Sequence, residues 1–324
     1  MVPLDSLMKH GKLVHGSVVS VDPSAKQVKL EDGTAIPYDV LLLAPGGRSF
    51  SPGEPPAKVS TKAGTEAFYN EMHVAIAMSK SVVIVGGGPV AIELAGEIKA
   101  HGQKDVKVTL VNKAPQLLAG PTPPTPGNLA AVGELLKSEQ VDVICNDEVA
   151  SVPFPQDIAN ASPIVPTPQG VTLKSGKQVS CDLLIFAVGG KLNTDFLPRE
   201  WVDGKTGEVL VDEKTLKLQS RDDVFCIGEA AKSSHIKLGY FFKQDGKVVA
   251  KNILQVLEGK QPTNTISRSS LVMVIPFGPK RGRLLMPFTT LGDWATSLAK
   301  GKGLFTKMHW SEFAPGKTPP EPTA

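Results

Sequence analysis

One continuous stretch, residues 81–113, constrains the fold more than any other part of the sequence. The apolar run 82–85 ends at Gly86-Gly87-Gly88, a segment rich in Ala, Leu and Glu then extends to Ala100, and residues 106–111 form a second apolar run. A strand, a glycine turn, a helix and a second strand within about 30 residues make one βαβ unit of a parallel sheet. We therefore predict an α/β fold built around this unit.

The glycine turn predicts a dinucleotide site. Gly86, Gly88 and Ala91 match the spacing G-x-G-x-x-G/A, in which the last position must be small so that the helix can pack on the strand. Glycine lets backbone amides approach a diphosphate, and the helix that follows presents unpaired N–H groups and the positive end of its dipole to the same anion. We predict that Gly86, Gly87, Gly88, Pro89 and Ala91 bind the coenzyme; a purely structural glycine turn is the alternative.

The end of the second predicted strand bears on coenzyme choice. Asn112 and Lys113 stand where an NAD-specific site has an acidic residue that binds the ribose 2′-OH. Strict NAD selectivity is therefore not expected. Lys113 either pairs with the 2′-phosphate of NADPH or is solvated, and the sequence leaves both open, so the predicted coenzyme is NAD(P)H.

The charge distribution limits the classes of partner. The chain has 324 residues and a net charge of +3, which argues against a nucleic-acid-binding protein. The segment from Gln261 onward is more basic, with eight Lys or Arg against three acidic residues. Trp294, Phe305 and Trp310 are interleaved with these charges, as in segments that touch anionic membrane surfaces, although a charged run is also typical of a solvated face.

Cysteine and histidine usage excludes several kinds of site. Cys145, Cys181 and Cys226 are scattered without a C-x-x-C pair, which argues against a disulfide framework, a cysteine zinc site and a dithiol relay. The six histidines form no i, i+4 pair, so we predict no metal site. No apolar run approaches 18 residues and the sequence starts without signal-peptide features, so we expect a cytoplasmic protein, with peripheral contact at an organelle membrane as an option.

Two similar halves are indicated by an internal repeat. Strands are predicted at 12–21, 27–31 and 39–43, and the last of these runs into Ala44-Pro45-Gly46-Gly47. A near-copy runs from the apolar segment 183–186 into Ala187-Val188-Gly189-Gly190. Between and after them we predict a helix at 129–138, a strand at 141–145, irregular structure or a distorted hairpin at 152–169, a helix at 239–257 and a small α+β tail.

These motifs together resemble a known family. The match covers nearly the whole chain through the following segments: Ala35-Ile36-Pro37-Tyr38 ahead of Leu41-Leu42-Leu43-Ala44-Pro45-Gly46, Val83-Ile84-Val85-Gly86-Gly87-Gly88 through Glu93, Val224-Phe225-Cys226-Ile227-Gly228-Glu229, Val248-Val249-Ala250-Lys251-Asn252-Ile253, and Gly301-Lys302-Gly303-Leu304-Phe305 with Trp310. The chain resembles the apoptosis-inducing-factor-like and ferroptosis-suppressor-like NAD(P)H:quinone oxidoreductases of the pyridine nucleotide-disulfide oxidoreductase superfamily. The resemblance implies bound FAD, hydride from NAD(P)H and a quinone-type electron acceptor.

The resemblance also implies roles for individual residues. Gly228 and Glu229 fall on the family's Gly-Asp motif, whose carboxylate binds the ribityl chain of FAD, and here that carboxylate is one methylene longer. Glu93 corresponds to a family glutamate near the nicotinamide; a polar residue in the first helical turn, favourable to the helix dipole, is the alternative. Gly189, in the second Ala-x-Gly turn, completes the predicted cofactor-binding residues together with Asn112 and Lys113.

One departure from the family concerns the FAD half. The family opens with its own glycine fingerprint upstream of the strand ribbon, whereas here the ribbon begins at about Lys12. Either the sequence is a shortened form of a working flavoenzyme, or it is a relative that binds a pyridine nucleotide without redox turnover. We thus predict two Rossmann-like domains, the first incomplete at its N-terminus: a residual FAD-type domain (1–64 and 189–260), an NAD(P)H-binding domain (65–188) and an α+β C-terminal region (261–324).

Overall fold

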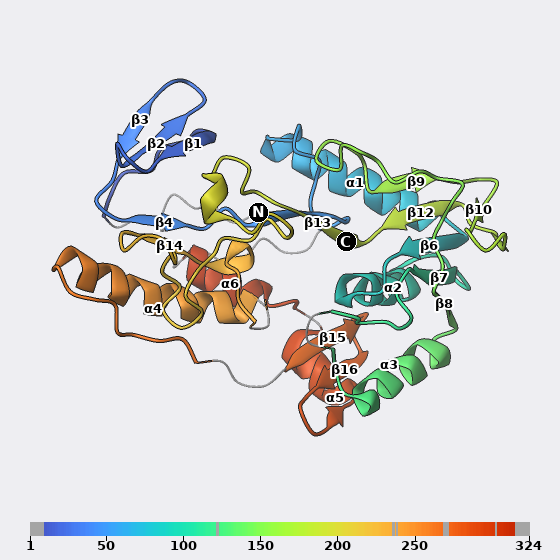
Figure 1. The fold of residues 1–324 in the computed structure, drawn as a ribbon. Helices are drawn as coiled ribbons and strands as arrows, with labels where there is room; N and C mark the ends of the chain where they lie inside the picture. Colours follow the sequence, from blue (N-terminus) through green and yellow to red (C-terminus); the bar gives the residue numbers. More distant parts are fainter. Residues whose placement is uncertain are drawn as a thin grey trace. The chain divides into compact units, whose positions relative to one another are not determined.

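The computed structural model describes residues 10–120, 123–234, 237, 239–267, 272–301 and 303–314. The chain divides into two compact units, each with its own core (Figure 1). Unit 1 comprises Met1–Leu13, Ser49–Gly189 and Ser270–Ala324, and unit 2 comprises Val14–Arg48 and Gly190–Ser269. The α/β class predicted from the sequence is confirmed.

Unit 1 is built on a five-stranded sheet with the order β8-β7-β6-β12-β9. Strands β6 (Ser81–Val85), β7 (Lys107–Asn112), β8 (Val141–Cys145) and β12 (Leu183–Phe186) are parallel, and β9 (Ile164–Pro166) is antiparallel to β12. The central strands are apolar on both faces, as expected for a parallel sheet whose two faces are both covered.

Three helices belong to this sheet: α1 (Lys62–Met78), α2 (Pro89–His101) and α3 (Pro126–Ser138). Helix α2 buries Ile92, Ala95 and Ile98 in the same core as the strands. Helix α3 begins at a Thr125 N-cap followed by a proline at the first helical position, where the missing N–H has no intrahelical partner to lose.

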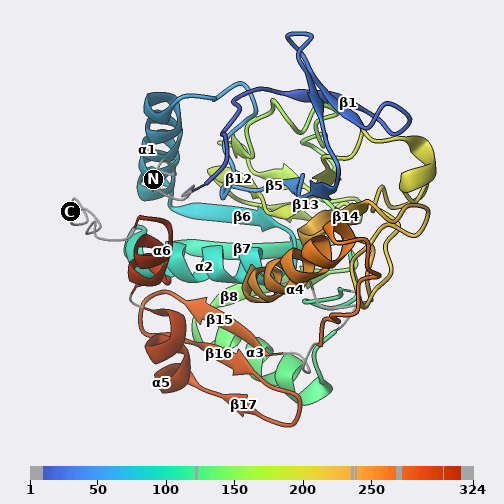
Figure 2. The same cartoon turned by 90° about the vertical axis from the view of Figure 1, so that its left-hand side faces the viewer.

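A small antiparallel sheet covers the outer side of α2 (Figure 2). It consists of β15 (Met273–Phe277), β16 (Arg281–Leu285) and β17 (Thr290–Leu291), followed by α5 (Asp293–Thr296), a π-helical turn (Ser297–Gly301) and α6 (Thr306–Phe313). At the contact, a Cβ on Gly96 would lie 2.5 Å from the Cα of Phe277. The absence of a side chain at Gly96 is what lets helix and strand backbones meet.

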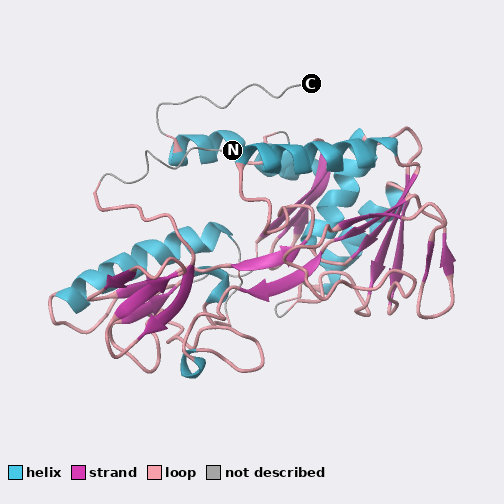
Figure 3. Cartoon of the chain, turned by 90° about the horizontal axis from the view of Figure 1, so that it is seen from above, coloured by secondary structure: helices cyan, strands magenta, loops and turns pink. Residues whose placement is uncertain are grey.

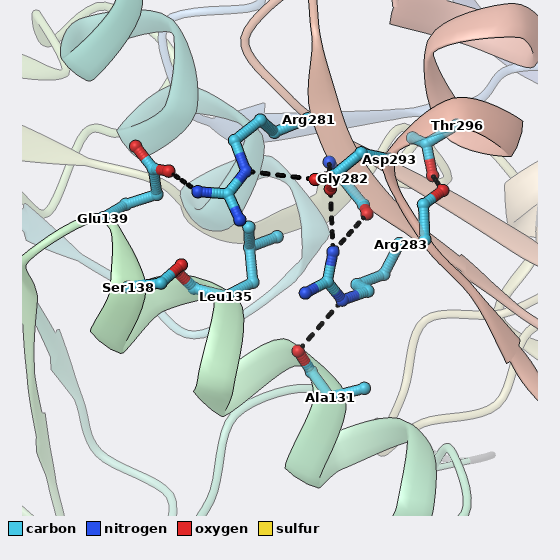
Figure 4. A network of polar contacts seen from close by, with 10 residues as sticks. Ala131, Leu135, Ser138, Glu139, Arg281, Gly282, Arg283, Asp293 and Thr296 are labelled. Carbon is cyan, nitrogen blue, oxygen red and sulfur yellow. Dashed lines mark hydrogen bonds and ion pairs between the residues drawn. The ribbon is translucent and has the colours of Figure 1, made fainter.

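An ion-pair network joins this small sheet to α3 (Figure 4). Arg281 on β16 pairs with Glu139, at the C-cap of α3, and with Asp293. Arg283 donates to Asp293 Oδ1 at 2.8 Å and to the carbonyl of Ala131 at 3.2 Å. The C-terminal region of the described chain is therefore part of unit 1, anchored on both α2 and α3.

Unit 2 combines an antiparallel sheet with a short parallel pair. The sheet has the order β1-β2-β3, with β1 (Val18–Asp22), β2 (Gln27–Leu30) and β3 (Ala35–Pro37), and β4 (Leu41–Leu43) is parallel to β14 (Val224–Cys226). Helix α4 (Gly239–Leu257) runs beside these strands and places Val249 in their core (Figure 3).

Short elements complete the fold. Two 3₁₀ turns, Arg199–Trp201 and Gly228–Ala230, belong to unit 2. Hairpin β10 (Val171–Thr172) and β11 (Gln178–Val179) belongs to unit 1, and the connecting strands β5 (Gly47–Phe50) and β13 (Val188–Leu192) pair with each other. No helix of the described residues is both long and apolar enough to cross a bilayer.

Two local predictions were wrong. Residues 12–17 are not part of a strand: this stretch is exposed, and strand pairing begins only at Val18. Helix α1 was not predicted. It has 17 residues and fully buries none of them, and Ala75 and Ile76 pack against the core while only partly buried, so its apolar pattern is weak. Its N-cap, Thr61, accepts from the Gly64 amide at 3.1 Å, a local signal that was available.

The close approach of α2 and β15 at Gly96 can be tested by adding a side chain there. We expect Gly96→Ala to destabilise the protein by about 1–3 kcal/mol, because the added methyl must push β15 away from α2. Gly133→Ala, on the exposed side of α3 with open space at its Cβ, is the control and is expected to be stabilising by about 0.5–1 kcal/mol. Urea unfolding of both variants measures the difference; equal stabilities would contradict the close contact.

Candidate functional site

The site at the carboxyl end of β6 begins with Gly86, which makes the tight turn out of the strand. Its φ is +136°, and a Cβ at this position would lie 2.2 Å from the carbonyl oxygen of Ala187. Its N–H donates to the carbonyl of Val111 at 2.9 Å. Only glycine fits here, for two reasons: its backbone has a positive φ, and the carbonyl of Ala187 after β12 lies too close for any side chain.

Gly87 is required by a different neighbour, Asn112. A Cβ on Gly87 would lie 2.5 Å from Cγ of Asn112, whose side chain is buried beneath the glycine turn. The Asn112 amide donates to the carbonyls of Ala114 at 3.1 Å and Gln116 at 2.8 Å. Asn112 therefore shapes the turn from below, with its amide N–H groups already used by its own loop.

Gly88 stands at the start of α2 and faces open space. It is the N-cap, with φ −81° and no side chain to satisfy the first-turn amides, and nothing lies within 4 Å of its Cβ position. Pro89 occupies the first turn of the helix, and the amides of Val90 and Ala91 have no intrahelical acceptor. This is the arrangement that binds anions at helix N-termini.

Ala91 fills the remaining position of the fingerprint. It is fully buried, and its Cβ lies 3.7 Å from the Cβ position of Gly86. The small side chain lets α2 pack closely on the turn and the strand. Gly86, Gly88 and Ala91 thus meet the three geometric requirements of the G-x-G-x-x-G/A fingerprint.

Glu93 lies on α2 and is paired with Lys300 of the π-helical turn. Lys300 Nζ is 2.8 Å and 2.9 Å from the two carboxylate oxygens of Glu93. Burial raises the pKa of Glu93, and the ammonium of Lys300 opposes that rise. The ion pair connects the first part of α2 to the C-terminal region, which no local sequence pattern indicates.

Lys113 directly follows β7 and forms an ion pair with Glu148. Its ammonium, on a side chain that is 80% exposed, lies 3.3 Å from Glu148 Oε1. Lys174 lies 3.0 Å from the other oxygen of the same carboxylate and is the main cause that lowers the pKa of Glu148. An acidic side chain is thus present at the end of β7, supplied by the segment after β8.

The predicted flavin residues Gly228 and Glu229 belong to unit 2. Gly228 has φ +80°, and Glu229 Oε2 lies 3.2 Å from the Cβ position of Gly47. Asn193 holds the turn before Gly47, since its backbone N–H and its side-chain amide donate to the carbonyls of Gly46 and Pro45, both at 3.0 Å. The fold therefore brings the Ala-Pro-Gly-Gly turn and the Gly-Glu motif together.

Two segments near the predicted flavin residues differ in the unit to which they belong. Residues 10–17, ahead of β1, form no helix, and of these residues 10–13 belong to unit 1 and residues 14–17 to unit 2. Gly189, exposed in β13 with open space at its Cβ, belongs to unit 1. The exposed carboxylate of Glu229, beside the turn at Gly47, has the chemistry to accept hydrogen bonds from the hydroxyls of a ribityl chain.

Metal and thiol chemistry are not indicated in the part of the chain that the structure describes. It contains no group of three His, Cys, Asp or Glu side chains that could hold a metal ion. Cys181 and Cys226 are buried, and burial raises the pKa of both thiols, to about 12 for Cys226. Such thiols are poor nucleophiles at neutral pH.

Four residues of these sites were missed or misread from the sequence. Lys300, Glu148 and Asn193 act through partners far away in sequence, so no spacing rule could find them. Asn112 was predicted to contact the coenzyme, and the structure places its side chain beneath Gly87. Its position at the end of a strand was visible in the sequence, but its burial depends on the tertiary fold.

Curated proteins of similar sequence cover most of this chain. The chain is 30% identical to apoptosis-inducing factor homolog A of Dictyostelium discoideum, covering 96% of this chain and 78% of that protein. It is 24% identical to human ferroptosis suppressor protein 1, covering 91% and 77% of the two chains. These alignments cover nearly the whole of the present sequence.

Solved structures share the fold at lower identity. A pyridine nucleotide-disulfide family oxidoreductase from Enterococcus faecalis superposes with a TM-score of 0.58 at 20% identity, covering 83% of this chain and 60% of that one. The water-forming NADH oxidase from Lactobacillus brevis, solved with NADH, gives 0.59, also at 20% identity, covering 83% and 57%. The chain thus spans less than two thirds of the length of these solved proteins.

Comparison of the sequence with protein-family models identifies the family. The model described as pyridine nucleotide-disulphide oxidoreductase matches residues 4–249, which include both the glycine turn of β6 and the Gly-Glu motif after β14. The chain belongs to the pyridine nucleotide-disulphide oxidoreductase family.

Proposed function

We propose that the protein is an FAD-dependent oxidoreductase that takes electrons from NAD(P)H and passes them to a quinone-type acceptor. The observation that carries the proposal is the open N-terminus of α2 behind Gly86, Gly88 and Ala91. Among its relatives is an FAD-dependent oxidoreductase of Flammulina velutipes, 27% identical over 94% of this chain. The proposed site on unit 1 is thus for the pyridine nucleotide.

Each residue of this site has a distinct task in the proposal. Gly88, with the amides of Val90 and Ala91, receives the coenzyme diphosphate, where the helix dipole adds to the attraction. Glu93 faces the nicotinamide end, and Lys300 fixes the position of its carboxylate. Asn112 keeps the glycine turn in shape from below.

For the flavin, the candidate ligands are Glu229 and the backbone around Gly47 and Gly228. Bound FAD would supply two-electron chemistry between the nicotinamide and the acceptor. Lys237 donates to the carbonyl of Glu229 at 2.7 Å and pairs with Glu208, so it holds the motif from outside. Because Cys181 and Cys226 are buried with raised pKa values, the proposal includes no thiol relay.

The described C-terminal residues of unit 1 suit contact with a membrane, where lipid-soluble quinones reside. Phe288, Trp294 and Leu298 are 99%, 70% and 82% exposed. Arg281, Arg283 and Lys300, which belong to the basic segment from Gln261 onward, pair with acidic side chains inside the unit. We propose peripheral membrane contact that rests mainly on exposed apolar side chains.

A second candidate function is pyridine-nucleotide binding without redox turnover. It is favoured by one observation, namely that the proposed coenzyme site at the N-terminus of α2 lies wholly within unit 1 and uses no residue of unit 2. In this case unit 1 would work as a nucleotide sensor or interaction module. Both candidates share the coenzyme site at Gly88 and differ only in flavin binding.

Coenzyme binding is tested at Gly88. We expect Gly88→Val to weaken NADH and NADPH binding at least about tenfold, because the side chain would fill the space of the diphosphate while its backbone conformation suits valine. Gly133→Val, exposed on α3, is the control and should bind like the parent protein. Calorimetric titration measures both constants; full affinity in the folded Gly88 variant would exclude a diphosphate at this turn.

Flavin chemistry separates the two candidates. We expect the purified protein, or the protein reconstituted with FAD, to show flavin absorbance that is bleached by NADH or NADPH and restored by a soluble quinone. We expect Glu229→Ala to lower FAD affinity, since its carboxylate lies beside Gly47. Protein that binds NAD(P)H but takes up no FAD would support the second candidate instead.

Membrane contact is tested by sedimentation with vesicles of phosphatidylcholine and phosphatidylserine. Replacing Trp294 and Leu298 together by serine should lower the vesicle-bound fraction about tenfold, because two exposed apolar side chains would no longer enter the interface. Met78→Ser, equally exposed on α1, should leave binding unchanged. If the double variant sediments like the parent, these side chains do not contact the lipid.

A further inference from the structure

Whether the proposed coenzyme site prefers NADH or NADPH depends on which side chains lie at the carboxyl end of β7. In a βαβ dinucleotide site the adenosine ribose lies there, and an acidic residue after this strand binds its 2′-OH in NAD-specific proteins. Here β7 ends at Asn112, whose amide is used beneath Gly87, and the next residue is Lys113. Neither residue itself supplies a carboxylate.

The chain after β8 turns back toward this point. Asn146 has φ +57°, a left-handed conformation, and its N–H donates to the carbonyl of Ala114 at 3.1 Å. The N–H of Asp147 donates to the carbonyl of Asn112 at 3.3 Å. These two backbone hydrogen bonds hold the residues after β8 next to the residues after β7. Glu148 therefore lies beside Lys113.

Glu148 is held in place from the opposite side as well. Lys174 reaches Oε2 at 3.0 Å, and the Lys174 N–H donates to the Glu148 carbonyl at 2.8 Å. Asp147 accepts from the amides of Glu148 and Ser175, which fixes the neighbouring turn. Because Lys174 lowers its pKa, the Glu148 carboxylate is ionised at neutral pH, and it remains anchored if Lys113 moves away.

We propose that Glu148 makes the protein prefer NADH over NADPH, which rests on the proposed coenzyme site at Gly88. Its carboxylate takes the place of the acid that β7 lacks and accepts a hydrogen bond from the ribose 2′-OH. It also pairs with Lys113, the cation otherwise suited to a 2′-phosphate. A 2′-phosphate at this position meets an anchored negative charge, and like charges at such distances repel.

The test is calorimetric titration of the full chain with NADH and with NADPH at one ionic strength. We expect the parent protein to bind NADH about five- to tenfold more tightly than NADPH. This is the size of effect expected from one partly exposed charge, that of Glu148. Glu148→Gln should bind NADPH more tightly and NADH slightly more weakly, so that the preference falls to about twofold or less. Adding Lys113→Gln to that variant should reduce the NADPH gain, because the released lysine supplies part of it and the loss of repulsion by Glu148 supplies the rest.

Glu134→Gln, the same charge change on the exposed face of α3, is the control and should keep the parent preference. A parent protein that prefers NADPH, or a preference unchanged by Glu148→Gln, would overturn the role of Glu148 and leave the coenzyme site at Gly88 standing. Failure of the folded parent to bind either coenzyme would overturn the proposed function and the inference with it.

Discussion

The close approach of Gly86 to the carbonyl of Ala187 is the contact on which the rest of unit 1 depends. It lets the chain segments that follow β6 and β12 run next to each other. In the glycine turn, the Gly86 N–H also donates to the carbonyl of Val111 on β7. From that turn α2 starts with its first amides uncovered. A side chain at Gly86 would separate the strand exits and remove the platform from which the helix begins.

Helix α2 then links the coenzyme site to the C-terminal region. One side of the helix packs on the parallel sheet, and Gly96 on the other side meets the backbone of Phe277. Lys300, from the same C-terminal region, holds Glu93 near the start of the helix. The small antiparallel sheet therefore stabilises the element that presents the proposed diphosphate site, although it contributes no residue to the fingerprint.

The sequence predicted those parts of the fold that depend on local patterns. The glycine turn, the strand 141–145 and the helix 239–257 were all visible as periodicity or as residues with special backbone freedom. Helix α1 was missed because it fully buries no side chain, and Glu148 and Lys300 were missed because their partners lie in other elements. The partners of Arg281 and Arg283, which anchor β16 on α3, could not be predicted from the basic character of the tail because they lie in another element.

The burial of Cys181 and Cys226 has a chemical consequence for a protein of the proposed acceptor class. Quinones are electrophiles that add to thiolates, and both sulfur atoms are kept in the protonated form inside apolar surroundings. Cys181 additionally lies 3.2 Å from the hydroxyl of Thr167. These two sulfur atoms are thereby shielded from arylation by the compound that the protein would reduce.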